Sequence, residues 1–301
     1  MAAIDPLVNY FYRPVRYGLV LGVARSLLAF GTFLTLIAND GHLLFKTQVK
    51  PFLDNQLIPI NFVNVFLLTP DRYIGYAKLG ACVVLLLVMS GWRPRITCLL
   101  HWYIAACFLN AAVDVDGGDQ ITSNLTLWLI PIGLLDNRKW HWDSEAATPL
   151  TEFGAARNIF INFNFLAIRL QMAVIYLHAA IGKFTVPEWI NGSAIYYWSR
   201  HPEFGLGETE FRLLRGLFRS GALLFCLNWL ILITELLLFT GLVMDRKYYK
   251  KLFILGFSFH FMIIWMHGLV SFFFAMTGGL TLYFLVDYYA VYHTEIQLSK
   301  L

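Results

Sequence analysis

Lys183 is the residue whose type and position point most directly to chemistry. It follows a long apolar segment, within residues 175–197, where a helix is expected to leave the hydrocarbon region of a membrane. A lysine at such a place can extend its ammonium group to the interface and act as an anchor. A desolvated lysine can instead act as a base, because burial disfavours its charged form. Lys183 is therefore a candidate catalytic base, with interfacial anchoring as the simpler alternative.

Two series of polar residues lead up to Lys183 on the same expected helix. Each series repeats every seven residues, and they comprise Asn162, Arg169, Tyr176 and Lys183, and Asn164, Gln171 and His178. A seven-residue repeat keeps side chains on one slowly drifting face. Because a helix with two polar faces cannot turn both to lipid, we expect it inside a bundle or beside a wet cavity. His178 is a second catalytic candidate, and Arg169, Gln171 and Tyr176 are candidates for a substrate-binding or structural network.

Later apolar segments carry three more ionisable residues. Glu235 lies in an uninterrupted apolar run, where a carboxylate should be paired or protonated, and Arg169 and Arg25 are its expected partners. Such a pair serves structure as readily as chemistry. His260 and His267 are seven residues apart and share a helix face, which makes His260 a third catalytic candidate. No metal-binding motif joins these histidines to others, so no metal is predicted.

The composition fixes the class of protein that holds these residues. Of 301 residues, 58% are hydrophobic and only 14% are charged, whereas a soluble domain has about 25% charged residues. The apolar runs are continuous rather than alternating, which excludes a membrane β-barrel. The sequence therefore predicts an all-α, multi-pass helical membrane bundle, formed as a single domain over residues 1–301. The small positive charge is explained by loops, so no nucleic-acid partner is expected.

Eight membrane spans are predicted from the apolar runs. They cover residues 17–38, 73–91, 96–114, 121–135, 158–182, 221–244, 252–275 and 278–293. With the N-terminus in the cytoplasm, the short inner loops are basic and the short outer loop 114–119 is acidic. This distribution obeys the positive-inside rule and places both termini in the cytoplasm. The acidic loop is interpreted as a solvated turn, with a site for a cation or a basic peptide as the alternative.

The second long outer loop, residues 183–220, contains an amphipathic stretch. Within 211–219, arginines occupy one helical face and leucines and phenylalanines mostly the other. The simpler interpretation is a short helix lying on the outer leaflet, and the alternative is a lid over a site.

The segment 176–201 resembles the core of the vitamin K-dependent gamma-carboxylase superfamily, whose bacterial members are called HTTM (horizontally transferred transmembrane) proteins. The resemblance is carried by Lys183, Trp189, Gly192, Tyr197, Ser199, Arg200 and His201. It extends in order over about residues 14–295, through Arg25, residues 169–171, Tyr176, Glu235, His260 and Phe272. Trp189 and Arg25 therefore join the candidate substrate-binding or structural network.

Within this superfamily the chain is most similar to the sporulation-delaying protein B (SdpB) family, on the stretches 116–124 and 129–138. That resemblance implies the bacterial inner (cytoplasmic) membrane, and a role in maturing a small secreted peptide toxin. An SdpA-like protein and the peptide precursor would be its partners, besides membrane lipid.

The carboxylase resemblance implies a chemistry for these positions. Lys183 would be the weak base that deprotonates a reduced, vitamin K-like quinone, oxygen would be the co-substrate, and His260 would assist by hydrogen bonding. Carboxylation, another peptide modification and no chemistry at all stay open. The alternative to an enzyme is a non-enzymatic membrane chaperone or export scaffold for the peptide precursor.

Overall fold

The computed structural model describes residues 5–15, 18–45, 59–143, 151–202 and 204–289. These residues form helices, with one isolated β-bridge between Trp92 and Trp140. Six of the described helical segments are long and apolar enough to cross a membrane. The prediction of an all-α, multi-pass membrane protein is therefore confirmed.

The long helices follow the predicted spans in order. They are α2 (Leu19–Ala38), α5 (Ile74–Ser90), α6 (Pro94–Ala111), α7 (Gly117–Leu134), α8 (Glu152–Phe184), α13 (Gly221–Thr240), α14 (Tyr249–His267) and α15 (Val270–Leu280), which continues as η5 (Thr281–Leu285). The six helices that are long and apolar enough to cross a membrane do not include α6 and α7. These two helices have 18 residues each but are more polar. The orientation and the count of eight spans therefore remain predictions.

The predicted boundary between the last two spans is wrong. The sequence places it between residues 275 and 278, but α14 ends at His267 and α15 begins at Val270. Gly268 has φ +68°, a left-handed conformation that suits glycine at the end of a helix. His267 consequently lies at the end of a helix rather than inside a span.

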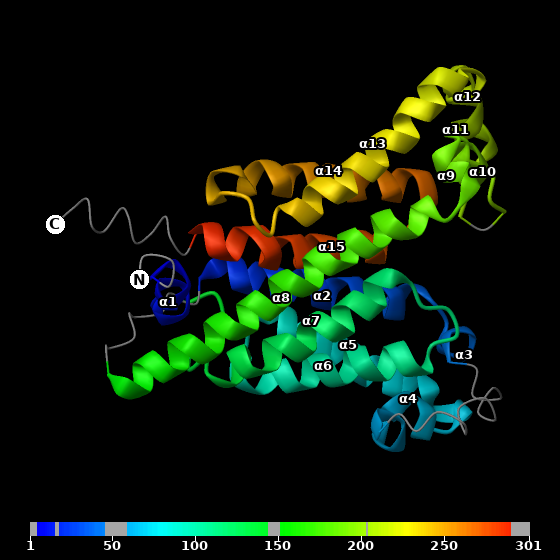
Figure 1. Cartoon of the computed structure of the whole chain (residues 1–301). Helices are drawn as coiled ribbons and strands as arrows, with labels where there is room; N and C mark the ends of the chain where they lie inside the picture. The colour runs from blue at the N-terminus through cyan, green and yellow to red at the C-terminus, as the bar shows by residue number, and fades with distance from the viewer. Residues whose placement is uncertain (1–4, 16–17, 46–58, 144–150, 203, 290–301) are drawn as a thin grey trace.

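Short helices stand at the two ends of the bundle (Figure 1). At one end lies α1 (Asp5–Tyr12), near the start of α2 and the end of α15. At the other end, four short helices form what we call the cap: α9 (Pro187–Ile190), α10 (Ala194–Ser199), α11 (Glu208–Leu213) and α12 (Arg215–Arg219). The remaining short elements are α3 (Gly41–Leu44), η2 (Pro59–Val63), α4 (Val65–Leu68), η3 (Asp71–Tyr73) and η4 (Arg246–Tyr248).

Helices α2 and α15 lie side by side through the middle of the bundle (Figure 1). Glycines permit their close approach: a Cβ on Gly31 would lie 2.9 Å from Ser271 O, and one on Gly278 would lie 2.9 Å from Leu28 Cγ. Small residues at helix contacts are the usual means of close packing inside membranes, where burial of apolar surface gives little drive.

A buried polar knot joins α2 to the loop after α7. Arg25 Nη2 donates to Thr97 Oγ1 at 3.0 Å, and Arg25 Nη1 lies 3.3 Å from His141 Nδ1. Arg138 donates to Asp136 and to His141 O. Because the guanidinium of Arg25 can only donate, the facing nitrogen of His141 must be an acceptor, which requires the neutral imidazole.

This knot makes stability depend on pH. Burial, and then the charges of Arg25 and Arg138, lower the pKa of His141 from 6.5 to about 3. Between these two pH values the unfolded chain therefore binds a proton at His141, whereas the folded chain does not. The stability that the neutral His141 contributes is fully present above pH 6.5. It is lost as the pH falls towards 3, and the loss is about 2 kcal/mol near pH 5. Thermal unfolding in detergent between pH 7.5 and 5 measures this loss.

Two variants isolate the contribution of His141 to the pH slope. His141→Gln keeps an acceptor for Arg25 but does not titrate, so its unfolding temperature should depend less on pH. His42→Gln removes an exposed histidine and should keep the wild-type slope. Equal slopes for His141→Gln and wild type would contradict the assignment.

Candidate functional site

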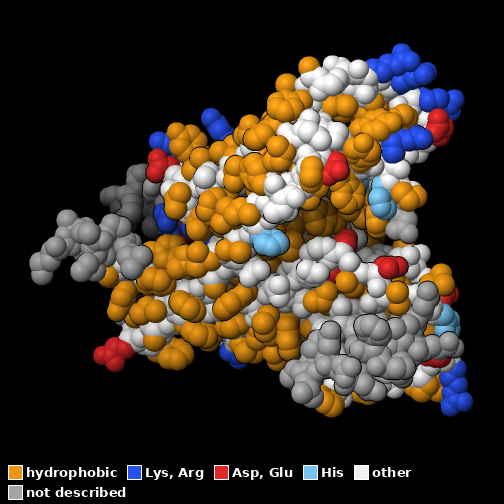
Figure 2. All heavy atoms as spheres, turned by 45° about the vertical axis from the view of Figure 1, so that its right-hand side comes forward, with side chains coloured by type: hydrophobic (Ala, Val, Ile, Leu, Met, Phe, Trp, Pro, Cys, Tyr) orange, Lys and Arg blue, Asp and Glu red, His pale blue; other side chains and the backbone are white. Residues whose placement is uncertain are grey.

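A cavity of about 840 Å³ lies between α13, α14 and the cap. Its lining is almost wholly apolar, and it includes three tryptophans, Trp189, Trp198 and Trp265. Figure 2 shows this face hollowed between the cap and the body of the bundle, with hydrophobic side chains around the hollow. The volume is in the range of small-molecule and cofactor sites, which are mostly apolar with a few placed polar groups.

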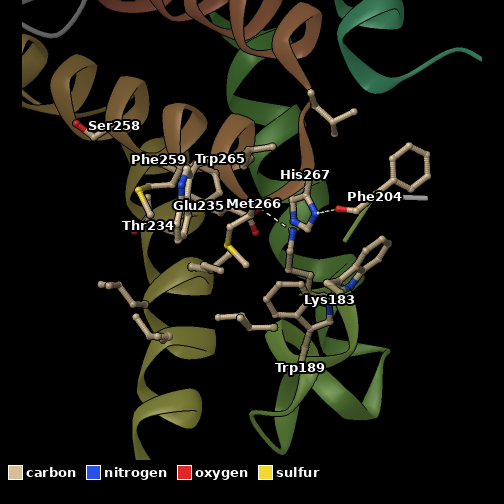
Figure 3. Close-up of a pocket in the computed structure, with 18 of the residues that line it drawn as sticks. Lys183, Trp189, Phe204, Thr234, Glu235, Ser258, Phe259, Trp265, Met266 and His267 are labelled. Carbon is tan, nitrogen blue, oxygen red and sulfur yellow. Dashed lines mark hydrogen bonds and ion pairs between the residues drawn. The ribbon is translucent and has the colours of Figure 1, made fainter. Parts of the chain in front are cut away.

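Lys183 and Glu235 form an ion pair in the mostly apolar wall of the cavity (Figure 3). Lys183 Nζ lies 2.7 Å from Glu235 Oε1 and also donates to Ala179 O at 3.3 Å. The Glu235 side chain is only 6% exposed and the Lys183 side chain 21%. Glu235 Oε2 is buried and has no hydrogen-bond partner among the described residues. Lys183 is therefore a paired and largely desolvated cation at the edge of an apolar space.

The predicted partners of Glu235 are wrong. Arg25 belongs to the knot with Thr97 and His141, and Arg169 binds Asp287 instead. The reason is the geometry of α8. Lys183 lies 14 residues beyond Arg169, which is about 21 Å along a helix, and only Lys183 reaches the level of Glu235 on α13.

The end of α8 fixes the ammonium group of Lys183. Thr185 caps the helix, Val186 is extended, and Pro187 occupies the first turn of α9. The residue before a proline is disfavoured in the helical conformation, so the chain turns here. The turn carries Trp189 back over Lys183, whose Nζ lies 5.2 Å from the centroid of the indole ring. This cation–π contact and the ion pair hold the ammonium between two walls of the cavity.

Tyr176 and His260 form a second buried pair, behind the cavity wall. Tyr176 Oη lies 3.0 Å from His260 Nε2, and His260 Nδ1 is buried without a partner among the described residues. Neither residue lines the cavity. The pair ties α8 to α14 two turns below Lys183, so its contribution to the site is to position α8 rather than to touch a bound molecule.

His267 joins α14 to the cap. Its Nδ1 lies 2.8 Å from Phe204 O, and both residues line the cavity (Figure 3). The amphipathic stretch 211–219 is two helices, α11 and α12, rather than one, with Leu214 between them. Leu214, Leu217 and Phe218 line the cavity, while the arginines of the stretch are exposed. The apolar face of this stretch thus covers the cavity, in agreement with the lid alternative.

Two candidates lie away from this site. His178 is exposed on α8, and Gln171 is half-buried outside the cavity lining. Asn164, the first member of their series, is buried. Seven residues fall short of two full turns by about 20°, so a series of three drifts by about 40°. The expectation that both polar series face inward is therefore wrong for His178.

Two carboxylates escaped the sequence analysis as site residues. Asp116 lines the cavity and caps α7, accepting from the backbone of Gly118 at 2.7 Å and of Asp119 at 3.1 Å. Burial raises the pKa of Asp116, and burial with the Asp116 charge raises that of Asp119 to about 7. The acidic loop is solvated at Asp114 and Val115, as predicted, but it ends in a helix cap at Asp116, and Asp119 is buried. Asp287, the partner of Arg169, is an acidic residue inside a predicted span, and that alone is a signal.

Two proteins of Bacillus subtilis (strain 168) are similar to this chain over most of its length. "Sporulation-delaying protein SdpB" is 32% identical over 262 residues, which are 86% of this chain and 79% of that protein. "Uncharacterized protein YitO" is 31% identical over 268 residues, which are 88% of this chain and 84% of that protein.

The chain belongs to the SdpB family. The predicted resemblance to this family is confirmed. No family model and no solved structure matches the chain, so the relation of the SdpB family to the HTTM and carboxylase superfamily stays a prediction.

Proposed function

We propose that this chain acts in the maturation of a small secreted peptide toxin at the outer face of the bacterial inner membrane, together with an SdpA-like partner protein. The chain belongs to the SdpB family, and its relative in that family is named a sporulation-delaying protein. This relation supports a role in the sporulation-delaying toxin pathway. Six apolar helices of sufficient length support the location in a membrane.

The cavity with its single ion pair carries the proposal. An apolar space of about 840 Å³ offers room for a few side chains of a peptide segment, which bind by leaving water. The pair of Lys183 and Glu235 at 2.7 Å gives that segment a charged group beside its backbone. The peptide precursor docks here, under the cap, with its reacting group next to Lys183.

The proposed chemistry is proton transfer. Lys183 is a base only when its amine is neutral, and the carboxylate oxygen Glu235 Oε1 lies 2.7 Å from its Nζ. The proton of Nζ must first pass along this hydrogen bond to Glu235 Oε1. Nζ then takes a proton from the bound substrate. His260 acts through Tyr176, by holding α8 in place.

A reduced quinone fits the same residues as a cofactor. The apolar lining and the three tryptophans suit a ring with an isoprenoid tail, and Lys183 with Glu235 would hold its polar edge. When bound, the quinone would supply electrons for oxygen-dependent modification of the peptide. The residues of this chain would exclude water and move the proton at Nζ.

A non-enzymatic scaffold is the second candidate, and one observation favours it. The ion pair of Lys183 with Glu235 joins helices α8 and α13, as a structural anchor would. In this case the cavity binds the precursor and releases it unchanged to the export machinery.

Site-specific photocrosslinking tests whether the peptide occupies the cavity. A benzophenone amino acid in place of Ile231, which lines the cavity on α13, is expected to crosslink the peptide precursor proposed as the substrate. The matched control is Ile233 on the same helix, which is 55% exposed and should crosslink lipid only. Crosslinking of the peptide at both positions, or at neither, would contradict docking in the cavity. A small lipid-like adduct at Ile231 alone would indicate the quinone.

A further inference from the structure

A cluster of three arginines surrounds one carboxylate at the end of the bundle opposite the cap. The oxygens of Asp287 lie 2.6 Å from Arg13 Nη2, 3.3 Å from Arg169 Nη1 and 3.1 Å from Arg246 Nε. Arg13 follows α1, Arg169 is in the middle of α8 and Arg246 begins η4, so four separate segments meet at this point. Since guanidinium groups stay charged, these four residues carry a net charge of +2.

Hydrogen-bonding groups in this cluster lack partners among the described residues. Arg13 Nη1 and Arg169 Nε are buried donors without an acceptor, and Asn162 Oδ1 is a buried acceptor without a donor. Asn162 is fully buried and Arg169 is 6% exposed. The amide of Asn162 cannot turn round to help, because its Nδ2 donates to Phe11 O at 3.0 Å and to Arg13 O at 2.9 Å.

The residues that carry these unsatisfied groups line one small pocket. Tyr10, Arg13, Asn162, Arg169 and Asp287 all line it, and its volume is about 20 Å³, enough for one oxygen-sized group. A single water would satisfy hydrogen bonds there, but it would leave one excess positive charge uncompensated among the largely buried side chains of Arg13, Arg169 and Asp287. Buried charge is costly unless it is paired, so the composition of the pocket calls for an anion.

We propose that this cluster binds a phosphate group, one oxygen of which enters the pocket between Arg13 and Arg169. Arginine binds phosphate oxygens with paired N–H donors. The remaining oxygens lie outside the pocket, within reach of Arg246, whose side chain is 40% exposed. In hydrogen phosphate the oxygen inside the pocket can be the hydroxyl, which then donates to Asn162 Oδ1. Basic pockets between membrane helices commonly hold lipid headgroups, and a free phosphate ion has the same chemistry.

Binding to the purified, detergent-solubilised full chain tests this proposal. One arm titrates phosphatidylglycerol against phosphatidylcholine and counts bound lipid by native mass spectrometry. The other arm adds inorganic phosphate against chloride at equal ionic strength and records the unfolding temperature. Arg13→Gln and Arg246→Gln are expected to weaken binding at least 10-fold. Arg95→Gln is the matched control, because Arg95 is exposed and donates to Leu134 O at the same end of the bundle.

Each outcome decides the question. Preference for phosphatidylglycerol alone assigns the phosphate to a lipid headgroup, and stabilisation by inorganic phosphate assigns it to the phosphate group itself. Binding of neither, or equal binding by wild type, Arg13→Gln and Arg246→Gln, overturns the proposal and leaves water in the pocket. The cluster is remote from Lys183, so photocrosslinking at Ile231 is read separately and does not depend on this result.

Discussion

Lys183→Ala is expected to reduce the yield of active peptide toxin at least about 100-fold, since a positioned general base contributes about 10²–10⁴-fold to a rate. The substitution removes the group proposed to face the bound peptide and leaves Glu235 as a buried carboxylate without its ion-pair partner. Growth inhibition of a sensitive strain by the culture medium measures the yield. The amount of the protein in the membrane is measured in parallel, because an unpaired buried charge also lowers stability.

Two companion variants separate the loss of the site from the loss of the fold. Glu235→Gln keeps an acceptor for Lys183 but removes the carboxylate, so it should fold well and still lose most activity. Lys78→Ala removes an exposed lysine that donates to Asn39 O at 2.8 Å, and it should keep full activity. Wild-type yield from Lys183→Ala, at equal protein amount, would exclude Lys183 from the function.

Asp287→Asn is expected to destabilise the protein by about 3–5 kcal/mol, the cost of removing one partner from a buried ion pair. The carboxylate of Asp287 is the shared partner of Arg13, Arg169 and Arg246. Its loss leaves three positive charges together at the junction of α1, α8, η4 and α15. The unfolding temperature in detergent measures the effect, and saturating phosphatidylglycerol should restore part of it if the cluster binds phosphate.

The matched control is Asp245→Asn. Asp245 pairs with Lys247 at 3.0 Å, but its side chain is 71% exposed, and exposed pairs contribute about 0–1 kcal/mol. Its unfolding temperature should stay near that of wild type. Equal effects of Asp245→Asn and Asp287→Asn would show that the three arginines do not depend on Asp287.

The sequence predicted the helices better than their contacts. Continuous apolar runs suffice to define a membrane helix, and the segments around Arg25, Lys183 and Glu235 all proved helical. The misplaced boundary at Gly268 has a simple cause. Glycine is frequent inside membrane helices, so Gly268 alone did not mark an end, and its φ of +68° is seen only in the structure.

Pairing across helices was beyond reach because it depends on the packed register. The sequence offered Arg169 and Arg25 as partners of Glu235, but the packing of α8 brings Lys183, 52 residues away, to 2.7 Å. Arg169 likewise meets Asp287 across 118 residues. A seven-residue repeat predicts that Arg169, Tyr176 and Lys183 share a face. It does not predict their partners, which are Asp287 for Arg169, His260 for Tyr176 and Glu235 for Lys183.

The most direct test of the central claim is the intact mass of the secreted peptide made with wild type, with Lys183→Arg, and without the chain. Arginine keeps the charge and the ion pair with Glu235 but cannot give up its proton. Lys78→Arg makes the same substitution at an exposed lysine and is the control. We expect the mature mass with wild type and Lys78→Arg, and the precursor mass with Lys183→Arg and without the chain. A mature mass with Lys183→Arg would contradict a base at this position, and a mature mass without the chain would contradict a role in maturation.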